Sequence, residues 1–395
     1  MIRVYLILFC LSIQSLYCVN KTEGTKTSFK ETKVSIISIG EGSSLADAFG
    51  HTGIRVISNG NDIVFNFGVY DFSAPNFYSN FVKGRPVYKL AVQKYENFKD
   101  GYIYQNRYLV EHELNISDES KMNIIDLLVN NSKPENKYYT YDYLRDNCST
   151  RVADILIDDT NNKFREYKLE SEAIITYREL IHEKISENSW AALGIDLCLG
   201  AIIDKKISVR ETFFIPEKLM KYMDELMIDY SKPITKNIIF SPDSPSKYNE
   251  EFPKPCLVNS IISLLIILLT YFNFKNNSWN RSIDFIIYLF SGLIGVLIIY
   301  LWFFSNHFAS AQNFNFLWAF HFNLAVVFAL IRKTPPLWTI NFVKLNIILL
   351  ILLFIHWTTG VQKYNITLLP IFISLLVRYS YLVIQINKTR HENLQ

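Results

Sequence analysis

The sequence predicts an exported α+β domain that is followed by a bundle of five membrane-spanning helices. The chain opens with an apolar run from Val4 to Ile13, which has the length of a signal peptide. A polar region with mixed strand and helix patterns follows and ends near residue 232. From Leu257 the chain consists of apolar runs close to the roughly 20 residues that a helix needs to cross a bilayer.

Residues 1–18 are expected to form a signal peptide or an N-terminal anchor. Cys18 follows Tyr17, whereas a lipidated cysteine usually follows a small residue. Lipidation of Cys18 therefore remains an alternative to ordinary cleavage or to an uncleaved anchor. Residues 19–33 are polar and rich in Lys and Thr, which predicts a flexible lead-in. Each alternative exports the domain that follows.

The exported domain is expected to span residues 34–232. Runs rich in β-branched and aromatic residues predict strands at 34–39, 52–58, 63–67 and 88–92. Asn59-Gly60 predicts a hairpin turn between the second and third of these runs. Apolar spacing and capping residues predict helices at about 95–109, 117–131, 148–157, 171–188 and 216–228. The proline-punctuated stretch 233–256 is expected to be a linker to the membrane region.

Five spans are predicted, at 257–273, 282–304, 314–331, 337–357 and 364–384. Loops that are rich in Lys and Arg stay on the cytoplasmic side of the membrane. Positive residues occupy alternate connections and the C-terminal tail, namely Lys275, Arg281, Arg332, Lys333, Lys388 and Arg390. We therefore expect a multi-pass protein of the inner membrane, with its exported domain in the periplasm and the tail 385–395 in the cytoplasm.

Charge and cysteine usage exclude several classes of function. The formal net charge is only +3 over 395 residues, so we expect no nucleic-acid partner. The five cysteines show no spacing typical of a zinc site or of a disulfide framework, and we expect neither a metal nor a cofactor. A disulfide between Cys148 and Cys198 remains an alternative to a free, reactive Cys148.

Two short segments carry the chemistry that we expect. His51 stands at the start of a predicted strand, and Cys148 lies in the first turn of a predicted helix. The positive end of a helix dipole and a nearby imidazole both lower the pKa of a thiol, and free N–H groups in the same turn can hold an oxyanion. This is the layout of a papain-type cysteine nucleophile, with the histidine first in the chain. Each residue alone is more often structural, but the pair favours an acyl-transfer enzyme.

A histidine base usually needs a third group that orients its ring. If the strands pair around Asn59-Gly60 through a two- or four-residue turn, Asn66 shares a face with His51. Asn66 is therefore the candidate orienting residue. Asp71 is the alternative if a bulge or an odd-length turn changes the parity. Asn147 is expected to cap the helix or to donate to an oxyanion.

Other polar residues are candidates for binding substrate. Arg151 and Arg210 suit phosphate or carboxylate groups, although a solvated surface position is the alternative. Asn306 and His307 lie at the outer end of the second span. Polar groups at membrane depth usually face a cavity or a partner, so this pair is expected to hold a lipid head group or to help orient the reacting ester. An ordinary interfacial loop is the alternative.

Several of these stretches resemble the Lnb-type lipoprotein N-acyltransferases of Bacteroidota. The resemblance lies in Phe49-Gly50-His51-Thr52, in 64–68 with Asp71-Phe72, in Asn76-Phe77-Tyr78, in 146–151, in 194–197, in Arg210-Glu211 and in 301–307. It covers nearly the whole chain after the leader, and it carries His51 and Cys148 over as the catalytic pair. The chain has Asn306-His307 where the resemblance leads us to expect Asp-His. The order of histidine and cysteine is also similar to that of permuted papain-like acyltransferases.

The resemblance implies a transfer of an acyl chain from a membrane phospholipid, through a thioester on Cys148, to the N-terminal amine of a diacylglyceryl-cysteine lipoprotein. It also implies a permuted papain-like fold for the exported domain. The alternative function is an envelope cysteine peptidase or amidase that acts on cell-wall peptides. That enzyme uses the same nucleophile but does not need five spans.

Overall fold

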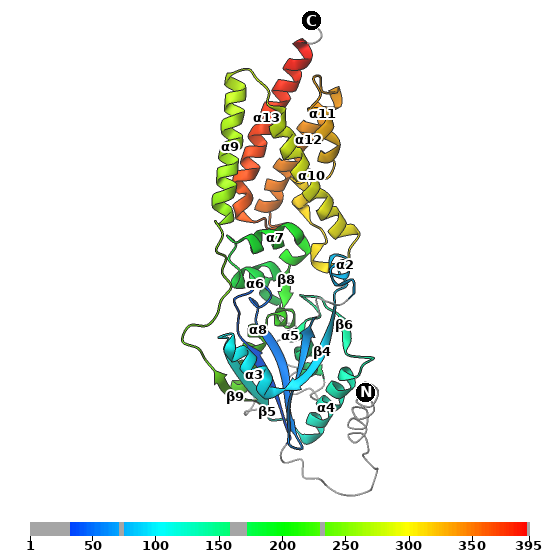
Figure 1. Cartoon of the computed structure of the whole chain (residues 1–395), viewed down its shortest axis with the longest axis vertical. Coiled ribbons are helices and arrows are strands. Elements are labelled where there is room, and N and C mark those ends of the chain that lie inside the picture. The colour runs from blue at the N-terminus through cyan, green and yellow to red at the C-terminus, as the bar shows by residue number, and fades with distance from the viewer. Residues whose placement is uncertain (1–31, 71–74, 159–171, 230–233, 393–395) are drawn as a thin grey trace, which may run out of the picture.

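The computed structural model describes residues 32–70, 75–158, 172–229 and 234–392. The molecule is elongated, with a sheet-containing domain at one end and a helical bundle at the other (Figure 1). The expected signal peptide, the lipidation of Cys18 and nearly all of the expected lead-in lie outside the described residues.

The N-terminal domain is built on a seven-stranded sheet in the order β6-β4-β3-β2-β1-β5-β9. All its neighbouring strands are antiparallel. The strands are β1 (Lys33–Ile39), β2 (His51–Ser58), β3 (Asn61–Val69), β4 (Val87–Lys94), β5 (Leu109–Leu114), β6 (Tyr138–Thr140) and β9 (Ile234–Phe240). A two-stranded sheet is formed by β7 (Glu172–Thr176) and β8 (Lys206–Ser208).

The β2–β3 hairpin follows from its turn residues. Asn59 and Gly60 have φ angles of 50° and 78°, and Ser58 pairs with Asn61. Positive φ at both central residues is the signature of a two-residue turn whose twist matches that of the strands. This turn sets the register, so Ile54 pairs with Phe65.

Helices cover both faces of the large sheet. α4 (Asp118–Ser132), α5 (Cys148–Asp158) and α8 (Pro216–Asp229) pack on one face, in a core that includes Ile36 of β1. α3 (Tyr95–Tyr104) packs on the other face, with Ile37 of β1. Successive strand residues point to opposite faces, which is why neighbours in β1 enter different cores.

Three expectations for this domain differ from the structure. The predicted helix 95–109 ends at Tyr104, and β5 begins at its last expected residue. The predicted helix 171–188 is β7 followed by α6 (Tyr177–Lys184). Part of the expected linker 233–256 is β9, the edge strand that pairs with β5. Polar side chains within β5 obscured its pattern: Glu111 pairs with Arg55 and His112 with Asp224, so both are satisfied by distant partners.

A group of smaller elements lies between the sheet and the bundle. It comprises α6, α7 (Trp190–Cys198) and the short helices η2 (Ala201–Asp204) and η3 (Arg210–Phe214). Figure 1 shows α6 and α7 directly beneath the membrane helices. α2 (Phe77–Val82) lies to one side at the same level.

The C-terminal region contains four helices that are long and apolar enough to cross a membrane, counted over the described residues. They are α9 (Pro255–Lys275), α10 (Arg281–Phe303), α12 (Leu337–Thr358) and α13 (Leu369–Glu392). The predicted third span, 314–331, is not a continuous helix. It consists of η5 (Phe314–Leu317), a short connection and the eight-residue α11 (Asn323–Leu330).

Polar partners inside the bundle explain this break. Asn323 donates to Ser291 of α10 and accepts from Asn346 of α12. The chain before α11 packs so closely on α10 that a Cβ on Gly295 would lie 2.1 Å from the carbonyl oxygen of Ala319. Irregular backbone is tolerated at membrane depth where protein buries it. The apolar composition of 314–331 predicted one continuous helix and did not reveal this break.

Candidate active site

Cys148 is the first residue of α5, and Asn147 caps that helix. The Asn147 side-chain oxygen accepts from the N–H groups of Ser149 and Thr150, at 2.8 and 2.9 Å. The Asn147 amide nitrogen donates to the carbonyl oxygens of Tyr143 and Phe214. The positive end of the α5 dipole is therefore held at the thiol. The donors of the Asn147 side chain are used by these carbonyls, so the geometry favours its expected role as a cap over its role as an oxyanion donor.

His51 is the first residue of β2, and its ring lies between two partners. Nε2 is 2.7 Å from the side-chain oxygen of Asn66 on β3. The imidazole also makes a side-chain hydrogen bond with Cys148. Because Asn66 occupies Nε2, the nitrogen available to the sulfur is Nδ1. The structure thus brings together the three residues that were expected to form the site.

The electrostatics favour an ion pair between Cys148 and His51. Burial raises the pKa of the Cys148 thiol, but the charge of His51, the hydrogen bond with His51 and the backbone N–H groups of Thr52 and Ser149 outweigh burial and lower that pKa. Burial lowers the pKa of His51, but the Cys148 charge and the hydrogen bonds with Cys148 and Asn66 raise it above its ordinary value. A lowered thiol pKa beside a raised imidazole pKa stabilises thiolate and imidazolium together.

A bulge in β3 brings the backbone close to the nucleophile. The register between β3 and β4 shifts between Asn66 and Val69. Within this bulge Gly68 has a φ of +85°, and a Cβ there would lie 3.3 Å from the Cβ of Cys148. β-Bulges often re-aim side chains beside active sites. This one brings β3 close to the first turn of α5.

Cys148 opens onto a cavity of about 520 Å³, which is within the range of ligand sites. Its walls come from the loop before β2, from α3, and from an aromatic group consisting of Tyr70, Tyr88, Tyr102, Tyr141 and Tyr143. The Tyr143 hydroxyl is buried and has no hydrogen-bond partner among the described residues. Burial raises the pKa of Tyr143 well above its ordinary value, and the charge of Cys148 adds to this effect.

Arg107 is a wall residue that sequence reasoning missed. Its side chain is 1% exposed and donates to the carbonyl oxygen of Gly40 and to Asp47. Its positive charge lowers the pKa of His51, although other contributions outweigh this effect. Arg107 reaches the cavity only because β5 pairs with β1, and β5 was not predicted. A charged residue directly before an apolar run was the available signal.

The other candidate residues lie elsewhere. Asp71 is outside the described residues. Arg151 forms an ion pair with Asp146 and lies over the ring of Tyr139, and Arg210 forms an ion pair with Asp154. Neither arginine is among the residues that line the Cys148 cavity, and their expected binding of substrate stays a prediction.

Asn306 and His307 connect the bundle to the N-terminal domain. The N–H of Asn306 donates to the carbonyl oxygen of Lys83. Nε2 of His307 lies 2.9 Å from the carbonyl oxygen of Phe81. Both residues lie outside the lining of the Cys148 cavity and contact α2 and the turn that follows it. Their expected binding of a lipid head group stays a prediction. The alternative disulfide is also excluded, because both Cys148 and Cys198 are free thiols.

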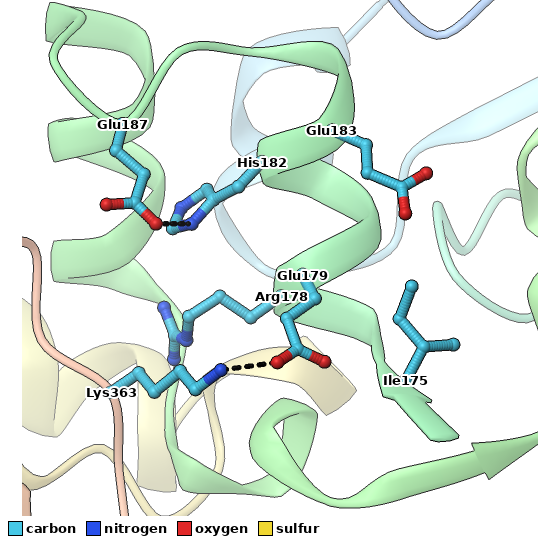
Figure 2. Close-up of a pocket in the computed structure, with 7 residues that line it drawn as sticks. All are labelled: Ile175, Arg178, Glu179, His182, Glu183, Glu187 and Lys363. Atoms are coloured by element: carbon cyan, nitrogen blue, oxygen red, sulfur yellow. Dashed lines mark hydrogen bonds and ion pairs between the residues drawn. The ribbon is translucent and has the colours of Figure 1, made fainter. Parts of the chain in front are cut away.

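A second cavity of about 400 Å³ lies where α6 meets the loop between α12 and α13. Figure 2 shows its lining residues, with Glu179 paired to Lys363 and His182 to Glu187. Arg178 is buried and donates to Asp196 and Asp204, each at 2.7 Å. These charged groups have partners, and several pairs join the two regions of the chain. The arrangement is that of a structural junction, whereas the Cys148 cavity contains a thiol whose pKa is lowered.

Comparison with family models shows to which protein family the chain belongs. The model of the Lnb N-terminal periplasmic domain matches residues 21–183, and the model of the Lnb transmembrane domain matches residues 247–390. The chain belongs to the Lnb family. The family expected from the sequence is confirmed, and the protein is a membrane protein with a periplasmic domain. Comparison with curated proteins and with solved structures finds no match.

The candidate site and the residues that contact its domain fall in different Lnb domains. His51, Asn66 and Cys148 all lie in the stretch matched by the periplasmic domain. Asn306, His307 and Lys363, which contact that domain, lie in the stretch matched by the transmembrane domain. The domains are α+β and helical, respectively. The permuted papain-like topology stays a prediction.

Proposed function

We propose that this protein is a lipoprotein N-acyltransferase that works through a thioester on Cys148. The observation that carries the proposal is the hydrogen-bonded chain Cys148–His51–Asn66, which faces a cavity in the periplasmic domain of an Lnb-family membrane protein. Such a unit combines a nucleophile, a base and an orienting group, which is the arrangement that covalent catalysis requires. The acyl donor is a phospholipid, and the acceptor is a diacylglyceryl-cysteine lipoprotein.

In the first half-reaction the Cys148 thiolate attacks an ester carbonyl carbon of the phospholipid. The negative charge that develops on the carbonyl oxygen needs hydrogen-bond donors. The backbone N–H of Cys148 and the hydroxyl of Tyr143 suit this role, because neither has a hydrogen-bond partner among the described residues. The tetrahedral intermediate then collapses. The imidazolium of His51 gives its proton to the leaving glycerol oxygen, which departs as a lysophospholipid and leaves the acyl chain on sulfur.

In the second half-reaction the free α-amine of the lipoprotein cysteine attacks the thioester. His51, now neutral, takes the proton from the nitrogen as the carbon–nitrogen bond forms. The Cys148 thiolate leaves, and the product is an amide. The ion pair of thiolate and imidazolium is thereby restored. Formation of an amide from a thioester is downhill, so the reaction needs no nucleotide.

A membrane-anchored active site suits these substrates, because donor and acceptor are both held by their acyl chains in the outer leaflet of the inner membrane. The apolar helices α9, α10, α12 and α13 fix the periplasmic domain at that surface. The residues that join the two parts include Asn306, His307 and Lys363.

The test is mass spectrometry of lipoprotein N-termini in a deletion strain that carries the wild-type gene or a variant. We expect the wild type to restore N-acylation, and Cys148→Ser and His51→Ala to fail at unchanged protein level. Loss of either member of such a unit costs about as much as loss of both. Cys198→Ser is the matched control, because Cys198 is also a free thiol and is partly buried.

Two outcomes contradict the proposal. Restoration of N-acylation by Cys148→Ser assigns Cys148 a structural role. Unchanged lipoprotein N-termini in the deletion strain, together with altered cell-wall peptides, favour the envelope peptidase or amidase instead.

A further inference from the structure

An exposed apolar face on α2 lies at the junction between the bundle and the periplasmic domain. Tyr78, Phe81 and Val82 are 70%, 50% and 49% exposed. Their spacing of three and four residues places them on the same side of the helix. Contiguous apolar surface of this kind marks an interaction with a protein, a ligand or a membrane.

Contacts on one side of α2 tie this face to the bilayer. His307 bonds to the Phe81 carbonyl oxygen, and the rings of Phe81 and His307 are 6.1 Å apart. A Cβ on Gly84, just after α2, would lie 2.5 Å from the His307 nitrogen, so the two backbones touch. His307 follows directly on the end of α10, where Phe303 and Phe304 are 61% and 71% exposed. Figure 1 shows α2 beside this end of the bundle. The exposed face of α2 therefore continues the lipid-facing surface of a membrane helix.

Contacts on the other side of α2 lead to the active-site cavity. The ring of Phe77, the buried residue of α2, lies 6.5 Å from that of Tyr70. The Tyr70 ring lies 5.3 Å from that of Tyr88, which stacks on Tyr141 at 4.2 Å. These three tyrosines line the cavity that contains Cys148. An unbroken series of aromatic rings thus runs from the bilayer side of α2 to the nucleophile.

We propose that this series, from the exposed face of α2 through Tyr70, Tyr88 and Tyr141, is the path by which an acyl chain of the donor phospholipid passes from the bilayer to Cys148. The inference rests on the proposed function and names the route of its donor. An acyl chain matches an aromatic, uncharged surface that is continuous with the lipid-facing helices. It also explains why an otherwise costly apolar helix face is left uncovered beside the membrane.

The first test separates the path from the chemistry. The full-length protein is reconstituted in vesicles of phosphatidylethanolamine and phosphatidylglycerol, without acceptor, and the thioester on Cys148 is followed by mass spectrometry. Tyr78→Ser with Val82→Ser is expected to slow this acylation roughly tenfold or more, since even one methylene contact is worth that much in discrimination. Acylation by the soluble ester p-nitrophenyl butyrate should stay within about twofold of wild type, because that ester reaches the site without the path.

The matched control is Ile238→Ser. Ile238 is 67% exposed on β9, the edge strand at the far side of the sheet from β6 and β4. This variant should be acylated by vesicles at the wild-type rate. Equal acylation of the α2 variant and the wild type overturns the path, and so does a variant that is equally slow with vesicles and with the soluble ester. A wild-type protein that vesicles fail to acylate overturns the proposed function instead.

The second test detects the lipid directly and does not depend on catalysis. The photoreactive residue p-benzoylphenylalanine is placed at Tyr78 or at Ile238 in protein that also carries Cys148→Ser. Irradiation in vesicles should attach phospholipid at position 78 and not at position 238. Absence of attachment at 78, or equal attachment at both positions, contradicts the path.

Discussion

The imidazole of His51 and the amide of Asn66 are joined across the β2–β3 hairpin, with 2.7 Å between His51 Nε2 and Asn66 Oδ1. An amide oxygen accepts but does not donate, so this contact places a proton on Nε2. Nδ1 then faces Cys148. Asn66 therefore selects the tautomer and the ring orientation of the base without taking part in proton transfer.

Asn66→Ala should weaken acyl transfer less than removal of Cys148 or His51 does. We expect a loss of roughly 10- to 100-fold, the range found when the partner that orients a metal-bound histidine is removed. Asn66→Gln is the companion variant, because it keeps the amide but moves it by one methylene. Initial rates of Cys148 acylation, measured with each purified variant, check the prediction. A loss in Asn66→Ala that equals the loss in His51→Ala would give Asn66 a direct role in the chemistry.

The reactivity of Cys148 toward iodoacetamide should depend on pH in a way that reports the ion pair. Only the thiolate reacts, and the pKa of Cys148 is lowered, so the rate should stay high as the pH falls below the ordinary thiol value of about 8.5. His51→Gln removes the largest contributions that lower this pKa and leaves only those of the Thr52 and Ser149 N–H groups against burial. The pKa of Cys148 should then rise, and the rate at pH 7 should fall roughly tenfold or more.

Mass spectrometry of the alkylated peptides measures this rate at each pH. Cys198 is an internal control, because burial raises its pKa and no histidine among the described residues opposes that effect. A Cys148 profile that coincides with the Cys198 profile, or one that His51→Gln leaves unchanged, contradicts the ion pair.

Local signals were sufficient to predict much of the site. Asn59-Gly60 specifies a two-residue turn, and that turn alone determines that Asn66 faces His51. Asn147 is a strong helix-capping residue, which places Cys148 in the first turn of α5. Both inferences use residues that are near one another in the chain.

The parts of the site and of the fold that the sequence did not predict depend on residues that are distant in the chain. Arg107 enters the cavity wall through the pairing of β5 with β1, and Tyr143 is placed by the packing around Phe214. The predicted helix 314–331 is broken because Asn323 forms hydrogen bonds with residues on two other helices. Hydrophobic periodicity describes one segment at a time and carries no information about these contacts.

Tyr143→Phe should slow acylation of Cys148 without altering the thiol itself. The variant keeps the ring that packs on Phe49 and Phe214 and removes only the hydroxyl, which has no partner among the described residues. Loss of one oxyanion donor costs about 100-fold or more in the chemical step. Alkylation by iodoacetamide forms no oxyanion, so its rate should not change. Equal slowing of acylation and alkylation would indicate a packing role instead.

Gly68→Ala should impair catalysis, whereas Gly60→Ala should affect stability alone. Both residues have positive φ, of +85° and +78°, and a side chain in that region costs about 1–2 kcal/mol. A Cβ at Gly60 meets nothing within 4 Å, but one at Gly68 presses on Cys148. Thermal unfolding and acylation rates of the two variants check the prediction. Equal activity of the two variants would mean that β3 shifts enough to accommodate the added methyl group.

The C-terminus should lie in the cytoplasm even though only four long helices are present in the described residues. Four crossings would return the C-terminus to the periplasm, and we expect η5 and α11 together to carry the chain across a fifth time. Arg281 donates to the carbonyl oxygen of Lys333, and Lys388 bonds to Asn277, so the positive ends of these helices gather on one side. Lys363 lies on the opposite side, where it pairs with Glu179 of the periplasmic domain.

Positive loops stay in the cytoplasm, so charge and contacts lead to the same orientation. Alkaline phosphatase is active only outside the cytoplasm, so fusions to this enzyme measure the orientation. Fused after Gln395 the enzyme should be inactive, and fused after Gly360, in the loop between α12 and α13, it should be active. Activity after Gln395 would mean that the 314–331 segment enters the membrane and leaves on the same side, so that the chain crosses four times.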